Sequence, residues 1–396
     1  MELFADLHVH LGSALGRPVK ISASRQLTLE GICRTAGAHK GLGVVGLVDA
    51  LTTGGLQELG AAVADGRLRE LPGGGFGTRD GLVLLSGIEV ELVVSGRRVH
   101  FVAFVPDLGS SRRLAARLAR HITNPWLSSQ QARGLDPGGL LEAVWASGGL
   151  LWPAHAFTPH RGLLGAAVRR ISAPVPEGLG QEVAVALAAV ELGLSADTDM
   201  ADRLSELGPH TFVSNSDAHS LGTLGREANL VRLEGPADFE GVAGALARRG
   251  RAGVLLNVGL DPRLGKYHRT VCLACVTQAS APPPVLTCPT CGSARVVTGV
   301  LDRLTAIADR AEPMHPPYRP PYRAQVPLAF LPGVGPVTQE HLRTQVGPEL
   351  HVLHRAPRED LERAAGPRIA ELILQARDGR LELAAGGGGR YGQVRG

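Results

Sequence analysis

Two short motifs place histidine and carboxylate side chains two residues apart, at the ends of apolar segments. His8 and His10 form an H-x-H motif, and Asp217 and His219 form a D-x-H motif. In a β-strand, residues i and i+2 point to the same face, so both side chains of a pair can reach one ion. These motifs therefore predict metal ligands that strand ends bring to a common rim.

Four further metal-capable residues end or interrupt other apolar segments: Asp49, Glu89, His100 and His155. Each histidine alone is as well explained as an ordinary core or surface residue, but repeated placement at strand ends favours a metal centre. Mixed imidazole and carboxylate ligation suits Zn, Mn or Fe rather than Ca. Two ions bridged by a carboxylate activate water and stabilise an in-line displacement at phosphorus.

Apolar, strand-like segments alternate with amphipathic, helix-like segments up to about residue 260. This alternation predicts an α/β fold with a mostly parallel sheet or barrel, in which functional residues gather at the C-terminal ends of strands. Strands are expected at residues 3–8, 44–49, 83–89, 99–105, 150–155, 183–192, 211–217 and 254–258. Helices are expected at residues 27–40, 56–64, 112–120, 139–146, 200–207 and 239–249.

The order of these motifs resembles the polymerase-and-histidinol-phosphatase (PHP) metallohydrolase family, and within it the endonuclease Q group. The resemblance covers roughly residues 1–312 and is carried by the segments PAHAFTP (153–159), ELGLSAD (191–197), SNSDAHS (214–220), LGREAN (224–229) and GKYH (265–268). It implies a distorted seven-stranded β/α barrel that holds up to three metals.

The resemblance also implies roles for single residues. One metal would be held by His8, His10, Glu89 and Asp217, and a second by Glu89, His100 and His155, with Glu89 as the bridge. Asp217, His219 and Glu89 would be the catalytic residues. A third metal of the family usually draws on a histidine just after the second-motif aspartate, and no such residue follows Asp49. Asp49 and His219 alone match that site, so it needs another ligand such as His160, which is equally an ordinary surface residue.

Four of the five cysteines form two C-x-x-C pairs: Cys272, Cys275, Cys288 and Cys291. Each pair can hold one tetrahedral ion through two thiolates, and the four together close its coordination shell. A closed shell leaves no open position, so the predicted zinc is structural and not catalytic. A redox dithiol is the alternative for a single pair.

Two glycine-containing turns lie between helical segments near the C-terminus. Residues 331–336 (LPGVGP) contain Gly333 and Gly335, and residues 364–370 (AAGPRIA) contain Arg368. The turns resemble tandem helix-hairpin-helix modules, in which backbone N–H groups at a helix N-terminus bind a phosphate without reading sequence. The second turn is equally an ordinary connection between helices. Arg226 is either a phosphate clamp or the partner of a carboxylate such as Glu227.

Charge and composition limit the classes of protein to which this chain can belong. Of 41 basic residues only three are lysine, which we attribute to codon usage of a GC-rich bacterial genome and not to function. Residues 263–396 carry 17 basic and 11 acidic side chains, against 24 and 26 in residues 1–262, as expected for a catalytic body with a polyanion-binding appendage. The sequence has neither a signal-peptide pattern nor an apolar run of the roughly 20 residues that span a bilayer. We therefore expect a cytoplasmic protein without membrane contact.

The predicted organisation has five parts. They are a barrel (1–262), a four-cysteine zinc module (263–312), a proline-rich linker (313–325), a helix-hairpin-helix-like domain (326–383) and a glycine-rich tail (384–396). The glycine-rich tail is expected to be flexible, with a docking role as the alternative.

The resemblance implies a metal-dependent DNA repair endonuclease acting on double-stranded DNA. It would nick the phosphodiester 5′ to uracil, hypoxanthine, xanthine or an abasic site, with two or three barrel ions (Zn or Mn, with Mg for activity) besides the structural zinc. A small-molecule phosphoesterase and a DNA-binding scaffold without barrel metals are the alternatives. Protein partners are left open.

Overall fold

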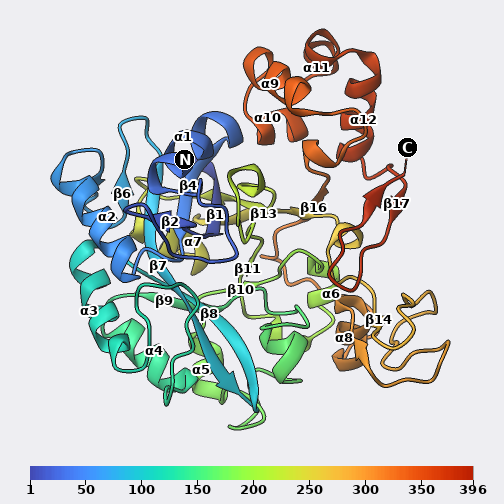
Figure 1. The fold of residues 1–396 in the computed structure, drawn as a ribbon, viewed down its shortest axis with the longest axis horizontal. Helices are drawn as coiled ribbons and strands as arrows, with labels where there is room; N and C mark the ends of the chain where they lie inside the picture. The colour runs from blue at the N-terminus through green and yellow to red at the C-terminus, as the bar shows by residue number, and fades with distance from the viewer. Residues whose placement is uncertain (396) are drawn as a thin grey trace.

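The computed structural model describes residues 1–395, and a ten-stranded mixed sheet forms their centre (Figure 1). Its main path runs β16-β13-β12-β1-β4-β7-β6-β5, and β8 and β9 continue from β7. The strands are β1 (Glu2–Val9), β4 (Leu42–Leu47), β5 (Arg69–Glu70), β6 (Phe76–Gly77), β7 (Val83–Val94), β8 (Arg97–Val105), β9 (Leu150–Pro153), β12 (Ala228–Arg232), β13 (Gly253–Leu260) and β16 (Tyr322–Gln325). Strands β1, β4 and β7 are parallel neighbours, whereas β7 and β8 form an antiparallel pair.

Two apolar layers cover opposite faces of this sheet. Adjacent residues of β1 belong to different layers: Phe4 lies in one, and Ala5 and Leu7 lie in the other. The first layer also includes residues of α1 (Leu29–Thr35), α2 (Thr53–Ala64), α3 (Leu108–Ala119) and α4 (Pro137–Trp145), and the second includes residues of α7 (Phe239–Leu246). Both faces of the central strands are therefore buried, which holds their C-terminal ends in fixed positions.

Close packing around one aromatic ring explains two glycines in the centre of the sheet. A Cβ atom on either Gly46 or Gly87 would lie 2.6 Å from the ring of Phe104. Phe104 in turn stacks on Trp152, with ring centroids 5.3 Å apart. Only glycine leaves room for this ring between β4 and β7.

The structure corrects two of the element predictions. Residues 183–192, expected to be one strand, form α5 (Gln181–Ala186) and then the short strand β10 (Val190–Glu191), which pairs with β11 (Phe212–Val213). Residues 313–325, expected to be a linker, end in β16, which pairs in parallel with β13 and belongs to the sheet. The expected seven-stranded barrel is not confirmed by this sheet of ten strands.

Two smaller units follow the sheet. The four-cysteine module contains β14 (Val271–Cys272), β15 (Val296–Val297) and α8 (Val300–Ile307). The helical domain contains α9 (Pro336–Gln345), α10 (Glu349–His354), α11 (Arg358–Ala365) and α12 (Pro367–Arg377), and forms a separate lobe at the top of Figure 1. Its own apolar cluster includes Leu342, Leu361 and Ile373. In residues 1–395 no helix is long and apolar enough to span a membrane.

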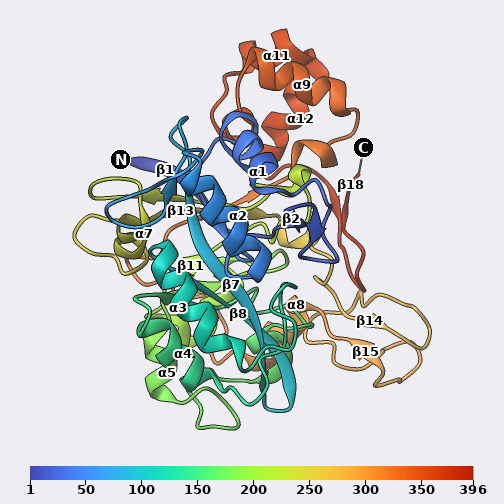
Figure 2. The same ribbon diagram turned by 60° about the vertical axis from the view of Figure 1, so that its left-hand side comes forward.

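The glycine-rich tail is docked. Strands β17 (Leu383–Ala384) and β18 (Gln393–Val394) form a hairpin that extends from the helical domain toward the four-cysteine module (Figure 2). Gly386 N–H donates to the carbonyl of Arg263 at 2.7 Å, and Gly389 N–H donates to that of Lys266 at 3.0 Å. A Cβ on Gly386 would lie 2.4 Å from the Gly265 carbonyl oxygen. Glycine here permits close backbone contact, not mobility.

Candidate metal centre

The first group of potential ligands joins strand β1 to the loop after β11. His8, His10 and Asp217 come together because Val9 and Ala218 form a parallel β-bridge. Asp217 Oδ1 lies 3.6 Å from His8 Nε2 and 3.3 Å from His10 Nε2. Atoms that share a tetrahedral ion at about 2.0–2.2 Å stand roughly 3.3–3.6 Å apart, so the spacing fits a metal.

The second group comprises Glu89 on β7, His100 on β8 and His155 after β9. Glu89 Oε1 lies 2.8 Å from His100 Nδ1 and 3.5 Å from His155 Nε2. The same oxygen is 3.5 Å from His8 Nε2 of the first group. Glu89 therefore lies between the groups, where a bridging carboxylate would have to be.

Buried, unpartnered nitrogens support metal ligation. Among residues 1–395, His8 Nε2, His10 Nε2 and His100 Nδ1 are buried and form no hydrogen bond of regular geometry, although each lies close to a carboxylate oxygen. Such atoms are costly unless a ligand satisfies them. In addition, His155 and Asp217 have positive φ angles of 30° and 46°, a strained backbone that is typical of functional sites.

Carboxylates behind the histidines fix the orientation of the rings. Glu191 lies 3.0 Å from His8 Nδ1, and Asp49 lies 2.9 Å from His10 Nδ1. With a metal bound, each Nδ1–H would donate to its carboxylate and leave Nε2 unprotonated and directed at the ion. Asp49 and His219, also expected as ligands, belong to neither group; His219 Nδ1 is instead 2.9 Å from the Asp217 carbonyl oxygen.

Sequence reasoning missed Glu191 and Lys20 as parts of this centre. Lys20 Nζ donates to Glu89 Oε2 at 3.0 Å and to the Ser129 hydroxyl. The available signals were weak: Glu191 ends a strand of two residues, and Lys20 is one of three lysines in a chain that otherwise uses arginine.

The charges of the centre keep its acids ionised. Burial alone would raise the pKa of Glu89, but His100 and Lys20 hold it well below its ordinary value. The pKa of Asp217 is likewise well below its ordinary value, because its bond to His10 and the charge of His8 outweigh burial. Burial would lower the pKa of Lys20, yet Glu89 and Asp49 raise it, so its ammonium stays charged.

The four cysteines converge on a second, separate metal site: Cys272, Cys275, Cys288 and Cys291. The Sγ atoms of Cys272 and Cys291 are 3.7 Å apart, and those of Cys275 and Cys288 are 3.5 Å apart. Thiolates that bind one zinc at about 2.3 Å stand about 3.8 Å apart in a tetrahedron. The N–H of Ala274 also donates to Cys272 Sγ at 3.3 Å, which stabilises a thiolate. The donor set and spacing fit a structural zinc.

Comparisons with known proteins agree with this architecture. No protein-family model matches the sequence. An uncharacterized protein of Bacillus subtilis, YqxK, is 42% identical over 398 residues, which cover 100% of this chain and 99% of that protein. A lesion-specific endonuclease of Pyrococcus furiosus, PfuEndoQ, matches with 29% identity and a TM-score of 0.82, over 100% of this chain and 95% of the other. An endonuclease Q solved with a 27-mer duplex carrying an abasic lesion at its active site matches with 30% identity and a TM-score of 0.83. The match covers 100% of this chain and 96% of that protein. The chain belongs to the endonuclease Q family. Its likeness to endonuclease Q thus extends past residue 312, through the helical domain and the tail.

A cavity of about 530 Å³ adjoins both metal groups. Its lining comprises Ser22, His155, Thr158, His160, Gly193, Leu194, Ser195, Asn215, Asp217, His219, Thr223, Arg226, Lys266, Tyr267 and Tyr391. His160, the suggested extra ligand, lies against the ring of Tyr267 with centroids 5.1 Å apart and belongs to neither metal group. The docked tail contributes Tyr391, so this endonuclease Q cavity has one wall from the C-terminus.

Arg226 lines the same cavity with its guanidinium held in place. It donates to the carbonyl oxygens of Ser216 at 2.8 Å and Asp217 at 3.3 Å, and to the Tyr391 hydroxyl. Glu227, the alternative partner, instead accepts the Leu260 N–H at 2.7 Å. Arg226 is therefore tied to the rim of the metal centre and not to its neighbouring carboxylate.

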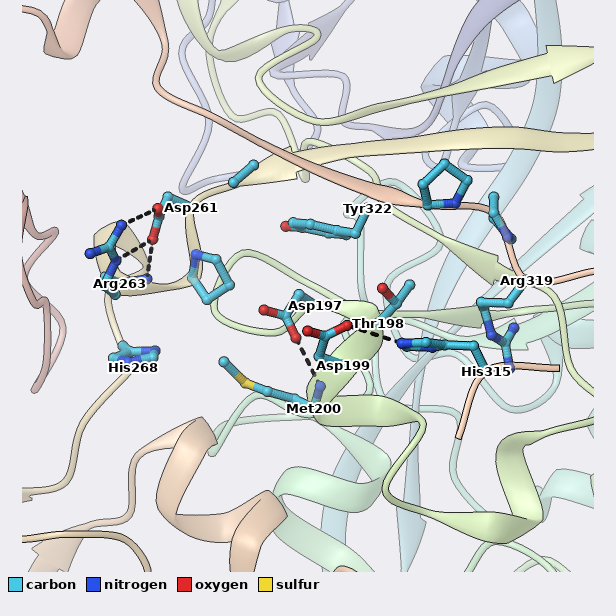
Figure 3. A pocket seen from close by; sticks show the side chains of 14 residues that line it. Asp197, Thr198, Asp199, Met200, Asp261, Arg263, His268, His315, Arg319 and Tyr322 are labelled. Atoms are coloured by element: carbon cyan, nitrogen blue, oxygen red, sulfur yellow. Dashed lines mark hydrogen bonds and ion pairs between the residues drawn. The ribbon is translucent and has the colours of Figure 1, made fainter. Parts of the chain in front are cut away.

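Figure 3 shows a different cavity, of about 720 Å³, which contains no member of the metal groups. Two of its carboxylates are paired: Asp261 with Arg263 at 2.8 Å and Asp199 with His315 at 3.2 Å. Burial raises the pKa of a third, Asp197, to about 6. The larger cavity therefore lacks the converging ligands that distinguish the smaller one.

Proposed function

We propose that the protein is a metal-dependent DNA repair endonuclease. It nicks the phosphodiester 5′ to deaminated bases (uracil, hypoxanthine and xanthine) and to abasic sites, leaving 3′-hydroxyl and 5′-phosphate ends. The observation that carries this proposal is a pair of adjacent groups of potential metal ligands, which Glu89 connects, in a chain of the endonuclease Q family. That neighbour's abasic duplex supports damaged double-stranded DNA as the substrate.

The metal centre would supply the hydrolytic chemistry. Two divalent ions, Zn or Mn with Mg for activity, would be held by His8, His10, Glu89, His100, His155 and Asp217. Bound there, they supply an activated water and neutralise charge on the phosphate. Glu191 and Asp49 orient the histidines of β1, and Arg226 offers its guanidinium to a phosphate oxygen at the rim.

His219 is a titratable group at this rim. It lines the cavity beside Asp217 and belongs to neither metal group. Burial lowers its pKa below the ordinary value, so the ring is neutral near pH 7. A neutral imidazole here can accept a proton from the attacking water.

Selection of the lesion would take place in the 530 Å³ cavity. An extruded base can enter it, and extrusion costs a few kcal/mol, least when the base is mispaired or missing. Deamination turns an exocyclic amino donor into a carbonyl acceptor on cytosine, adenine and guanine alike. A donor that lines the cavity, Lys266, suits a carbonyl and leaves an amino group unsatisfied, at a cost of about 1–3 kcal/mol. The methyl group of thymine would exclude it by shape.

The helical domain would bind the duplex without reading its sequence. Helices α9 and α12 begin in the same way, with a glycine N-cap (Gly335 and Gly366) followed by proline. Gly333 and Gly366 have positive φ angles of 83° and 82°, and Gly335 and Arg368 are exposed. We assign both turns as phosphate-binding hairpins, with Arg368 adding positive charge at the second.

Duplexes that each carry one defined lesion in the same sequence test the proposal. They are incubated with the protein and Mg or Mn and analysed on a denaturing gel, with the fragment ends mapped. We expect nicks 5′ to uracil, hypoxanthine, xanthine and abasic sites, and none in the matched undamaged duplex.

Asp217→Asn is the matched control, because it keeps the shape of the side chain and removes the anionic ligand. It should lower the cleavage rate by about 10²–10³ or more while DNA binding remains. Equal cleavage of undamaged DNA, or activity only on small phosphate monoesters, would favour the phosphoesterase alternative. Full activity of Asp217→Asn would refute the metal assignment.

A further inference from the structure

Lys20 places a fixed positive charge inside the proposed metal centre. The residue follows the short hairpin of β2 (Ser13–Ala14) and β3 (Arg17–Pro18). Its backbone N–H donates to the carbonyl of Leu11 at 3.0 Å, one residue beyond the ligand His10. The side chain is only 13% exposed, and its ammonium donates to Glu89 and Ser129. Backbone and side chain together hold the charge in place.

The two oxygens of Glu89 have different nearest neighbours. Oε1 faces the histidines, at 3.5 Å from His8 Nε2, 2.8 Å from His100 Nδ1 and 3.5 Å from His155 Nε2. Oε2 faces Lys20 Nζ at 3.0 Å, accepts from Ser129, and lies farther, at 3.8 Å, from His10 Nε2. The carboxylate is thus held between the histidine ligands on one side and a buried ammonium on the other.

Asp49, the carboxylate near Lys20 that belongs to neither metal group, already accepts hydrogen bonds on both oxygens. Asp49 Oδ2 accepts from His10 Nδ1 at 2.9 Å and from the Leu11 N–H at 2.8 Å, while Oδ1 accepts from the Ser128 hydroxyl. A divalent ion beside Glu89 Oε2 would meet the ammonium at hydrogen-bonding distance, and like charges at that range repel strongly. The position is already occupied by a cation that the chain itself supplies.

We propose that Lys20 takes the place of a third metal ion, so that the barrel binds two divalent ions and Glu89 is fixed as their bridge. Lys20 is in this sense a positioning residue: it acts through Glu89. The inference rests on the proposed metal centre, but it concerns the number of ions and not the DNA that is cut.

Metal counting on the purified full-length protein tests the inference. The protein and its variants are equilibrated with excess Mn, freed of unbound ion and analysed for Mn and Zn per chain. We expect two exchangeable Mn in the native barrel beside the zinc of the cysteine site. Lys20→Ala, which removes the charge and opens the space, should bind a third Mn. Lys20→Arg keeps the charge and should return the count to two.

A control and a fold check complete the design. Lys266→Met removes a lysine from the neighbouring cavity, outside both metal groups, and should leave the count at two. Thermal melts verify that each variant is folded. Three Mn in the native barrel would overturn the inference without any variant, and so would a folded Lys20→Ala that still binds two with native affinity. A native protein that binds two Mn but cuts no lesion would refute the proposed function alone.

Discussion

Glu191 should control metal affinity without touching the metal, and Glu191→Gln tests this. The carboxylate is fully buried and accepts hydrogen bonds from three donors. His8 Nδ1 reaches its two oxygens at 3.0 and 3.1 Å, Asn215 Nδ2 reaches Oε2 at 3.0 Å, and the His155 N–H reaches Oε1 at 3.1 Å. Burial raises the pKa of Glu191, but the charge of His8 outweighs burial and holds it below the ordinary value, so the group is an anion.

Glutamine keeps the shape but replaces one acceptor oxygen with an NH₂ donor. In either orientation the NH₂ group meets another donor, from Asn215 or from the His155 backbone. One buried donor then stays unsatisfied, at a cost of about 1–3 kcal/mol in folding free energy. Loss of the anion behind His8 should lower metal affinity about 10–100-fold, the usual effect of removing such a partner.

A competition titration with a chromogenic chelator measures the metal affinity of Glu191→Gln, and a thermal melt measures its stability. Glu240→Gln on α7 is the matched control, because that side chain is exposed. A folded Glu191→Gln with metal affinity within about threefold of native would refute the assigned role of the carboxylate.

Three further predictions concern other parts of the chain. Cys288→Ser combined with Cys291→Ser should lower zinc by one per chain and weaken DNA binding while the barrel stays folded; unchanged zinc content would disprove this ligand set. A Cβ at Gly335 would meet no atom within 4 Å, so Gly335→Glu should fold normally while repelling phosphate. It should weaken binding to all duplexes alike and reduce the slope of log K against log salt by about 0.9 per lost contact; an unaltered slope would make the turn structural. His354 has its pKa lowered to about 3 by burial and nearby arginines, so it stays neutral in the fold while the unfolded chain gains a proton below about pH 6.5. The contribution of neutral His354 to the free energy of unfolding is therefore fully present above about pH 6.5. It falls by about 1.4 kcal/mol per pH unit as the pH decreases below about 6.5. Thermal melts of His354→Gln should therefore depend less on pH between about 6.5 and 4 than melts of the native protein.

The convergence of six candidate ligands could be predicted from the sequence because their spacing reflects strand geometry. His8 and His10 share a face since strand residues alternate, and Glu89 and His155 lie at or after the apolar cores of their strands. The residues behind them could not be predicted in this way. Glu191 reaches His8 across 183 residues of sequence, and no local pattern encodes such a pairing. Lys20 likewise reaches Glu89 across 69 residues, from a loop without periodicity.

Two errors in the predicted fold have similar causes. Residues 183–192 are small and apolar, and a short apolar run does not distinguish a strand from a buried helix. Residues 322–325 follow a run of prolines, which favours an extended linker, yet their register with Asn257–Leu260 adds them to the sheet. In both cases a tertiary contact decided the structure where local composition was ambiguous.

The docked tail shows why the parts of this chain do not act independently. Tyr391 comes from beyond the helical domain, yet it accepts a hydrogen bond from Arg226, and its ring lies 4.6 Å from Lys266 Nζ. The ring of Phe330, at the entry to the helical domain, packs against it with centroids 5.6 Å apart. A single side chain thus touches the rim of the metal centre, the segment that leads to the cysteine site and the base of the helical domain. Removing residues 326–396 would therefore open the 530 Å³ cavity as well as remove the two glycine-containing turns. For this reason Gly335→Glu, which leaves Tyr391 in place, separates duplex binding from lesion recognition where a truncation cannot.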